Sequence, residues 1–142
     1  MDTKKRKVMV FGTFDIFHPG HESFLKQAKK YGDYLIVVIA RDKTVKSVKS
    51  RKQTKNEKER KKVVEKSGLV DKSVLGGITN KYAVIRRYKP ETICLGYDQK
   101  IFTENLENWL KKVGLEHINI KRMKPFKPQK YKSSIIAKRG VF

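Results

Sequence analysis

The sequence predicts a doubly wound α/β fold, in which a parallel sheet carries helices on both faces. Short continuous apolar runs alternate with helix-like segments along the chain, and such runs are typical of strands that are covered on both faces. The connections between them are short, and glycine or proline stands at several boundaries. Strand–helix alternation with short connections favours a parallel sheet between two layers of helices.

Five segments are predicted strands, and helical segments separate them. The strands span residues 7–12, 33–40, 70–77, 92–98 and 117–122, of which 33–40 is the clearest buried strand. The helices span residues 21–32, 56–68, 80–90, 103–114 and 133–139, and a short helix running into a loop is expected in the basic segment 41–55.

Capping residues and apolar spacing support the helices. The face of the first helix that should be buried comprises Phe24, Leu25, Ala28 and Tyr31. The second opens with Asn56, and Glu59 follows at the spacing of a capping box. Thr103 is predicted to cap the helix at 103–114, whose apolar residues recur at helical spacing.

The length and composition suit one small domain. The chain has 142 residues, no repeat and no linker, so we expect a single domain over 1–142. No apolar stretch approaches the roughly 18 residues of a membrane span, and no signal peptide precedes the first strand, which predicts a cytoplasmic protein without a membrane partner. The single cysteine, Cys94, excludes an internal disulfide and is expected to be a buried hydrophobe.

Charge is the extreme feature of the composition. The chain has 35 Lys and Arg against 14 Asp and Glu, a formal net charge of +21. Such a field attracts nucleic acid, nucleotides or phosphorylated metabolites, and charge alone does not choose among them. A nucleic-acid partner is the weaker interpretation, because no RNA-binding fingerprint is present and the aromatic residues fall at helical core spacing.

The loop after the first strand concentrates polar chemistry. The stretch VFGTFDIFHPGHESFL, residues 10–25, contains His18 and His21, two of the three histidines in the chain. In open parallel sheets ligands bind beyond the carboxyl ends of the strands, where the strand order reverses. This loop therefore lies where a ligand is expected.

A helix that starts with HPGH has the elements of a phosphate site. Its unpaired N–H groups and the positive end of its dipole attract anions, and Gly20 allows a close approach to the backbone. His18 and His21 are three residues apart and so share one side of the first turn. Two imidazoles there can stabilise charge on a phosphorus centre and on a departing pyrophosphate.

Zinc is the alternative for two close histidines. A zinc site needs at least one further ligand, and the third histidine, His117, opens a different strand. We therefore favour phosphate chemistry at His18 and His21, with Gly12 and Thr13 binding a second phosphate group at the end of the first strand.

The string GTFDxFHxGH resembles the signature of the nucleotidyltransferase superfamily, in its cytidylyltransferase-like branch. Segments such as NEKERKKVV, VDKSVLG and LGYDQ match the family's order and spacing, so the resemblance covers nearly the whole chain. It implies a Rossmann-like five-stranded parallel sheet of order 3-2-1-4-5. It also implies transfer of a nucleotidyl group from a nucleoside triphosphate to a phosphate-bearing acceptor, with release of pyrophosphate.

The resemblance also implies roles for individual residues. His18 and His21 would be catalytic, stabilising the transition state at the α-phosphate. The nucleotide-binding residues would be Gly12, Thr13, Phe14, His18, His21, Gly96, Asp98, Ser133 and Ser134. Of these, Ser133 and Ser134 lie in KYKSSII, a partial match to the family's phosphate-binding helix start. Arg60 would lie near the triphosphate, and dimerisation is common in the family.

Two acceptors remain open at this point. The strings ARDKTVK, VDKSVLG and LGYDQ look most like archaeal-type FAD synthases, which adenylylate FMN with ATP and a divalent metal. The alternative is glycerol-3-phosphate cytidylyltransferase, which uses CTP and usually has a GxDW-like string where this chain has Gln99 after Asp98.

Acceptor, flavin and metal contacts complete the predicted site. Lys46 and Lys49 follow the second strand on the ligand side and would clamp a phosphate, unless they belong to a solvated basic face. The wall for a flavin ring would come from Phe14, Phe17 and Tyr97, unless these rings pack at strand ends. Mg²⁺ or another divalent cation would bind mostly through the triphosphate, with one carboxylate from Asp15 or Asp98.

Overall fold

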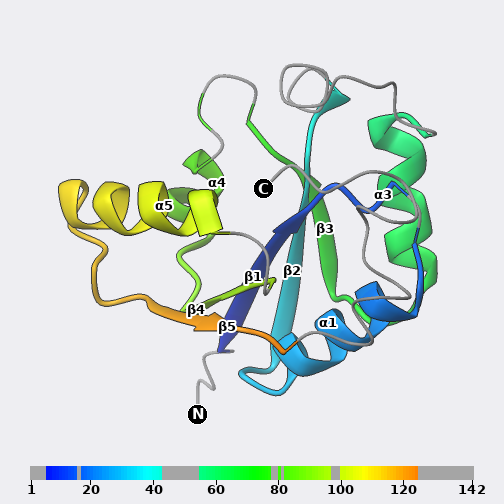
Figure 1. Cartoon of the computed structure of the whole chain (residues 1–142), viewed down its shortest axis with the longest axis horizontal. Helices are drawn as coiled ribbons and strands as arrows, with labels where there is room; N and C mark the ends of the chain where they lie inside the picture. Colours follow the sequence, from blue (N-terminus) through cyan, green and yellow to red (C-terminus); the bar gives the residue numbers. More distant parts are fainter. Residues whose placement is uncertain are drawn as a thin grey trace, which may run out of the picture.

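The computed structural model describes residues 6–15, 17–42, 55–77, 80, 82–96 and 100–124, with the backbone alone at 100–104. They form a five-stranded parallel sheet of order β3-β2-β1-β4-β5, which confirms the predicted topology (Figure 1). The strands are β1 (Lys7–Gly12), β2 (Tyr34–Ile39), β3 (Lys72–Leu75), β4 (Thr92–Leu95) and β5 (Asn119–Arg122). The helices are α1 (Pro19–Lys29), α3 (Glu57–Lys66), α4 (Ala83–Tyr88) and α5 (Lys100–Lys112).

The two faces of the sheet bury two separate cores, as a doubly wound sheet requires. Alternate side chains of β1 point to opposite faces: Met9 and Phe11 pack with α4 and α5, whereas Val8 and Val10 pack with α1 and α3. These four side chains of β1 are each at most 1% exposed. The continuous apolar runs therefore predicted strands covered on both faces correctly.

Several predicted element boundaries were wrong; β3 and α4, for example, are shorter than the segments predicted at 70–77 and 80–90. Tyr31 lies beyond the end of α1 and is 42% exposed, because the helix ends at Lys29 before its apolar face reaches that turn. Thr103 lies inside α5, which begins at Lys100, so Thr103 is not its N-cap. The strand predicted over 92–98 ends at Leu95. The helices predicted within 41–55 and over 133–139 fall outside the described residues, apart from the first two and the last residue of 41–55.

Cys94 lies in the middle of β4 and is fully buried. Burial raises the pKa of its thiol to about 12, so the thiolate needed for reaction is scarce at neutral pH. In the part of the chain that the structure describes, no helix has the length and the apolar character needed to cross a bilayer.

The sheet order places the first loop at the crevice. β1 is flanked by β2 on one side and by β4 on the other, and all three run parallel. The chain leaves β1 toward β2 and later crosses to β4, so the direction of winding reverses between β1 and β4. The loops after Gly12 and Leu95 therefore begin at the edge where parallel sheets bind ligands.

Candidate active site

The turn after β1 depends on Gly12 and Phe14. The backbone of Phe14 is left-handed, with φ of 53°, and its ring folds back over the end of the strand. A Cβ atom at Gly12 would lie 2.5 Å from ring atom Cε2 of Phe14. Phe14 is only 3% exposed, so its ring is packed against the end of the strand.

His18 caps helix α1 through its side chain. Its Nδ1 atom accepts a hydrogen bond from the Gly20 N–H at 3.0 Å, and its extended backbone breaks the helix at that point. Nδ1 of His21 accepts a longer bond, 3.4 Å, from the N–H of His18. The two histidines together form a capping box, a role that Ser, Asn and Glu usually fill.

These bonds determine where each imidazole carries its proton. A nitrogen that accepts a hydrogen bond bears no hydrogen, so the neutral ring is protonated at the other nitrogen. Both His18 and His21 are thus Nε2–H tautomers. Burial lowers the pKa of His18 below its ordinary value of 6.5, so this ring is a neutral donor at neutral pH.

Aromatic contacts hold the two imidazoles in place. The rings of His18 and His21 stack with centroids 3.9 Å apart. Phe17 stacks on His21 at 5.6 Å, and Phe14 meets His21 edge-on at 5.0 Å. His21 therefore has three rings around it, while His18 and His21 both stay partly exposed. Phe17, proposed from the sequence as part of a flavin wall, contacts His21.

Two further residues of the loop, Thr13 and Asp15, are buried and bound to other parts of the protein. Asp15 is 4% exposed, and its Oδ1 atom accepts the Lys55 N–H at 2.8 Å. Thr13 is also 4% exposed, and its carbonyl accepts a hydrogen bond from Arg60 at 2.8 Å. Arg60 itself is fully buried. Arg60 binds Thr13 directly and is linked to Asp15 through Lys55, whose carbonyl accepts from Arg60 at 3.2 Å.

The loop after β4 contributes Gly96, whose carbonyl accepts a 2.6 Å hydrogen bond from Arg122 of β5. The predicted site residues Lys46, Lys49, Asp98, Ser133 and Ser134 lie outside the described residues. Among the described residues, no group of three His, Cys, Asp or Glu side chains is close enough to hold a metal.

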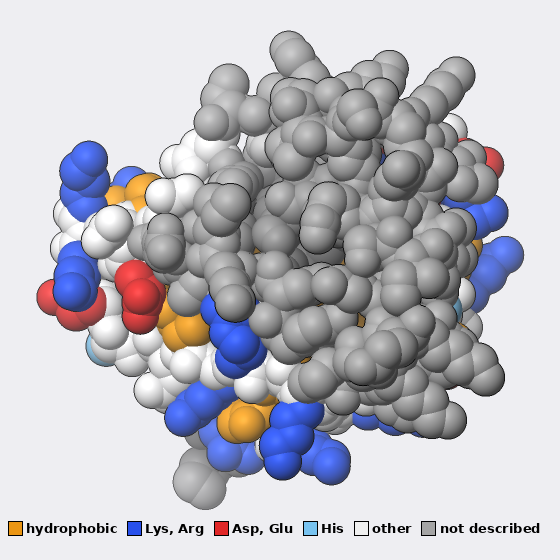
Figure 2. Space-filling view, in the orientation of Figure 1, with side chains coloured by type: hydrophobic (Ala, Val, Ile, Leu, Met, Phe, Trp, Pro, Cys, Tyr) orange, Lys and Arg blue, Asp and Glu red, His pale blue; other side chains and the backbone are white. Residues whose placement is uncertain are grey.

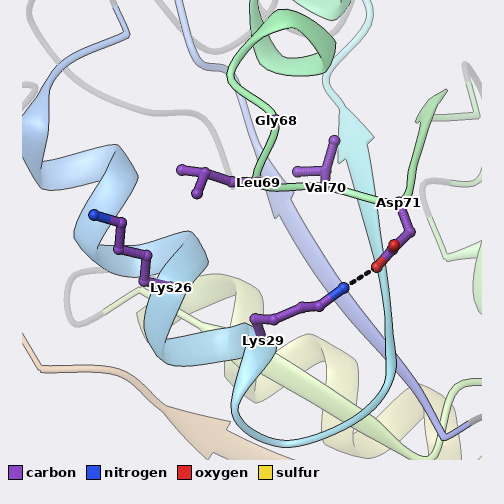
Figure 3. Close-up of a pocket in the computed structure, with 6 residues that line it drawn as sticks. All are labelled: Lys26, Lys29, Gly68, Leu69, Val70 and Asp71. Carbon is purple, nitrogen blue, oxygen red and sulfur yellow. Dashed lines mark hydrogen bonds and ion pairs between the residues drawn. The ribbon is translucent and has the colours of Figure 1, made fainter.

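A pocket lies elsewhere, at the opposite edge of the sheet. It is lined by Lys26, Lys29, Gly68, Leu69, Val70 and Asp71, between the end of α1 and the segment before β3 (Figure 3). Lys29 and Asp71 form an ion pair across it. The amino ends of the strands are on this side, so the pocket is remote from the histidines.

Comparison with known proteins decides the family. The family model described as cytidylyltransferase-like matches residues 9–139. The chain belongs to the cytidylyltransferase-like family. This confirms the resemblance drawn from the GTFDxFHxGH string.

Relatives of this cytidylyltransferase-like chain include two proteins named FAD synthase. That of Aciduliprofundum boonei is 42% identical over 120 residues, covering 84% of this chain and 79% of its own. That of Ferroglobus placidus is 45% identical over 111 residues, covering 78% and 72%. Among solved structures, the lipopolysaccharide core biosynthesis protein from Thermoplasma volcanium is 34% identical with a TM-score of 0.81, over 87% of this chain and all of its own.

Sequence reasoning missed Asp42 and Lys55, which both bind Arg60. One signal was available. Arg60 and Val64 are four residues apart on α3 and therefore share a face, and Val64 is a core residue. An arginine on the apolar face of a lysine-rich helix predicts a buried guanidinium with hydrogen-bond acceptors around it.

Proposed function

We propose that this chain is an FAD synthase, which transfers AMP from ATP to FMN and releases pyrophosphate. The observation that carries the proposal is its 42–45% identity to two FAD synthases, each covered over more than two thirds of its length. The family membership and the HPGH helix start support the same chemistry.

In the reaction, an oxygen of the FMN phosphate attacks the α-phosphorus of ATP. The bond from that phosphorus to the oxygen bridging the α- and β-phosphates breaks, and the pair of electrons leaves with pyrophosphate. Charge builds on the phosphoryl oxygens in the transition state, and fixed donors stabilise it without reorganising. We assign this role to the Nε2–H groups of His18 and His21, which their Nδ1 bonds orient.

Other contacts of the site follow the sequence pattern. The proposal retains Gly12, Thr13, Phe14, Gly96, Asp98, Ser133 and Ser134 as the surroundings of the nucleotide, and Asp15, Lys46 and Lys49 near the acceptor or phosphates. Mg²⁺ or another divalent cation would neutralise the phosphates, bound mainly by their oxygens. Of the two candidate carboxylates, Asp15 is buried and accepts the Lys55 N–H, and Asp98 lies outside the described residues.

The assay that tests the proposal offers the protein ATP or CTP together with FMN or glycerol 3-phosphate, with Mg²⁺, in all four pairings. Pyrophosphate release and FAD formation with ATP and FMN alone are expected. Turnover with CTP and glycerol 3-phosphate would instead establish the glycerol-3-phosphate cytidylyltransferase alternative. If no pairing reacts, the acceptor assignment is wrong.

The proposal extends to the setting of the enzyme. We place its activity in the cytoplasm, with ATP and FMN as partners and no nucleic acid, in a single domain over 1–142. A homodimer is the assembly that the family resemblance implies, and sedimentation equilibrium of the purified chain would test it.

A further inference from the structure

Arg60 is the largest fully buried side chain of the described residues, with 0% exposure. Burying a guanidinium is costly unless its N–H groups find acceptors. Arg60 extends from α3, a helix whose other buried residue is Val64 in the core. What surrounds the guanidinium must therefore compensate for its desolvation.

Three acceptors surround it, one from each of three segments. Nη1 donates to the carbonyl of Thr13 at 2.8 Å, Nη2 donates to Oδ1 of Asp42 at 2.8 Å, and Nε donates to the carbonyl of Lys55 at 3.2 Å. Thr13 belongs to the loop after β1, Asp42 follows β2, and Lys55 precedes α3.

Two further bonds join the same segments. The N–H of Lys55 donates to Asp15, and the N–H of Asp42 donates to Oε1 of Glu57, each at 2.8 Å. Arg60 is thus the centre of a network that connects the loop after β1 to the segment after β2 and to the start of α3.

We propose that Arg60 is a positioning residue, which holds the loop after β1 in the shape that places His18 and His21 for phosphoryl chemistry. The connection is short: Arg60 binds the carbonyl of Thr13, the next residue is Phe14, and the ring of Phe14 meets His21 at 5.0 Å. This inference rests on the proposed function and replaces the phosphate contact that the sequence suggested for Arg60.

Arginine suits this role where lysine does not. A guanidinium is a planar fork with five N–H donors, whereas an ammonium is a compact point charge on a flexible stem. Lysine at position 60 would retain the charge but could not reach three acceptors in three directions. Arg60→Lys therefore tests whether position 60 needs only a positive charge or also the planar shape and multiple donors of a guanidinium.

The experiment compares Arg60→Lys, Asp42→Ala and the double variant with Lys58→Met as control. Lys58 is exposed on the same helix, so Lys58→Met removes a charge without touching the three acceptors. kcat and KM for ATP are measured separately, and the ¹⁵N-imidazole NMR signals of His18 and His21 are recorded in each variant.

We expect Arg60→Lys to lower kcat about ten-fold or more, with KM for ATP changed less than about three-fold, and to shift the imidazole signals. Asp42→Ala should act in the same direction, and the double variant should be little worse than the worse single one, because both remove one network. Lys58→Met should match the wild type.

A rise in KM for ATP without loss of kcat, with Asp42→Ala neutral, would show that Arg60 binds phosphate and would overturn the inference. Wild-type kcat and unshifted imidazole signals in Arg60→Lys would also overturn it. If Arg60→Lys fails to fold, Asp42→Ala decides by the same readouts. If the wild type fails to turn over ATP and FMN, the proposed function fails, and the imidazole signals still decide the role of Arg60.

Discussion

His18 has two separable tasks, and a substitution can remove one of them. Its Nδ1 atom caps α1, while its Nε2–H is the proposed donor to phosphate. Asparagine is a favoured N-cap with an acceptor oxygen near the position of Nδ1, but it lacks the distal donor.

We predict that His18→Asn keeps the melting temperature within about 2 °C and lowers kcat about 10²-fold or more. His18→Ala should lose the same activity and about 1 kcal/mol of stability as well, and His21→Ala should lose about 10²-fold in kcat. Steady-state kinetics and thermal melts measure these effects. His117→Ala is the control, because His117 is exposed and remote; full activity in both His18 and His21 variants would refute the mechanism.

The pH dependence of His18 has a definite sign. Burial lowers its folded-state pKa below the 6.5 of the unfolded chain. As the pH falls below 6.5, the unfolded state takes up the proton first, so this residue's contribution to stability is present above 6.5 and is lost toward the folded pKa. Protonation at Nδ1 would also break the cap. An imidazole titration by NMR should give a midpoint below 6.5, and a midpoint above it would contradict the burial.

At the scale of elements, the β1–α1 turn depends on the contact between Gly12 and the Phe14 ring. We predict that Gly12→Ala costs about 1–3 kcal/mol, because the buried ring must move to admit a methyl group. Adding Phe14→Leu should recover part of that loss, since the smaller side chain leaves room. Chemical denaturation measures both.

Gly68→Ala is the matched control for this prediction. Gly68 has φ of 75°, and nothing lies within 4 Å of a Cβ atom there, so the variant adds backbone strain of roughly 1–2 kcal/mol without a clash. It should leave turnover unchanged, being at the far end of α3. Equal loss of turnover in the Gly12 and Gly68 variants would show that general stability, and not the turn, governs activity.

Much at this scale was predictable from the sequence. The capping box of Asn56 and Glu59 forms as its spacing predicts, with both hydrogen bonds at 2.9 Å. The strand order followed from the family resemblance. The end of α1 and the start of α5 were not predictable, because helical spacing at Tyr31 and a good cap at Thr103 are local signals that tertiary packing overrides.

The site was predictable in part for the same reason. The positions of His18 and His21 at a helix start follow from HPGH, yet their mutual ring stacking and their Nδ1 bonds depend on three-dimensional contacts with Phe14 and Phe17. The three acceptors of Arg60 come from segments up to 47 residues away in sequence, and no local pattern encodes such distances.

At the scale of the whole molecule, basic residues recur at the ends of the helices. Every described helix has basic residues in its last turn, where they stabilise the negative end of the helix dipole. Parallel packing brings these ends toward one edge, and Lys and Arg side chains gather along the lower edge in Figure 2. His18 and His21, at the start of α1, lie toward the other edge.

The net charge of +21 should make added salt act in two opposite directions. Screening relieves repulsion within the fold, so raising NaCl from about 0.02 to 0.5 M should stabilise it by about 1 kcal/mol and raise the melting temperature by about 4 °C. The same screening weakens attraction for ATP, so KM should rise while kcat changes less. Melts and kinetics in the two buffers test this, and a melting temperature that falls with salt would contradict it.

The Nδ1 atoms of His18 and His21 both cap α1 and orient the two rings, so local unfolding at the start of α1 should affect turnover. When the first turn of that helix transiently unwinds, both imidazoles lose their orientation in the same event. His18 accepts the N–H of Gly20 and His21 accepts the N–H of His18, so both bonds depend on the backbone of this turn. On heating, turnover should therefore be lost at a lower temperature than that at which the sheet unfolds, since helix ends open at lower free energy than a buried core.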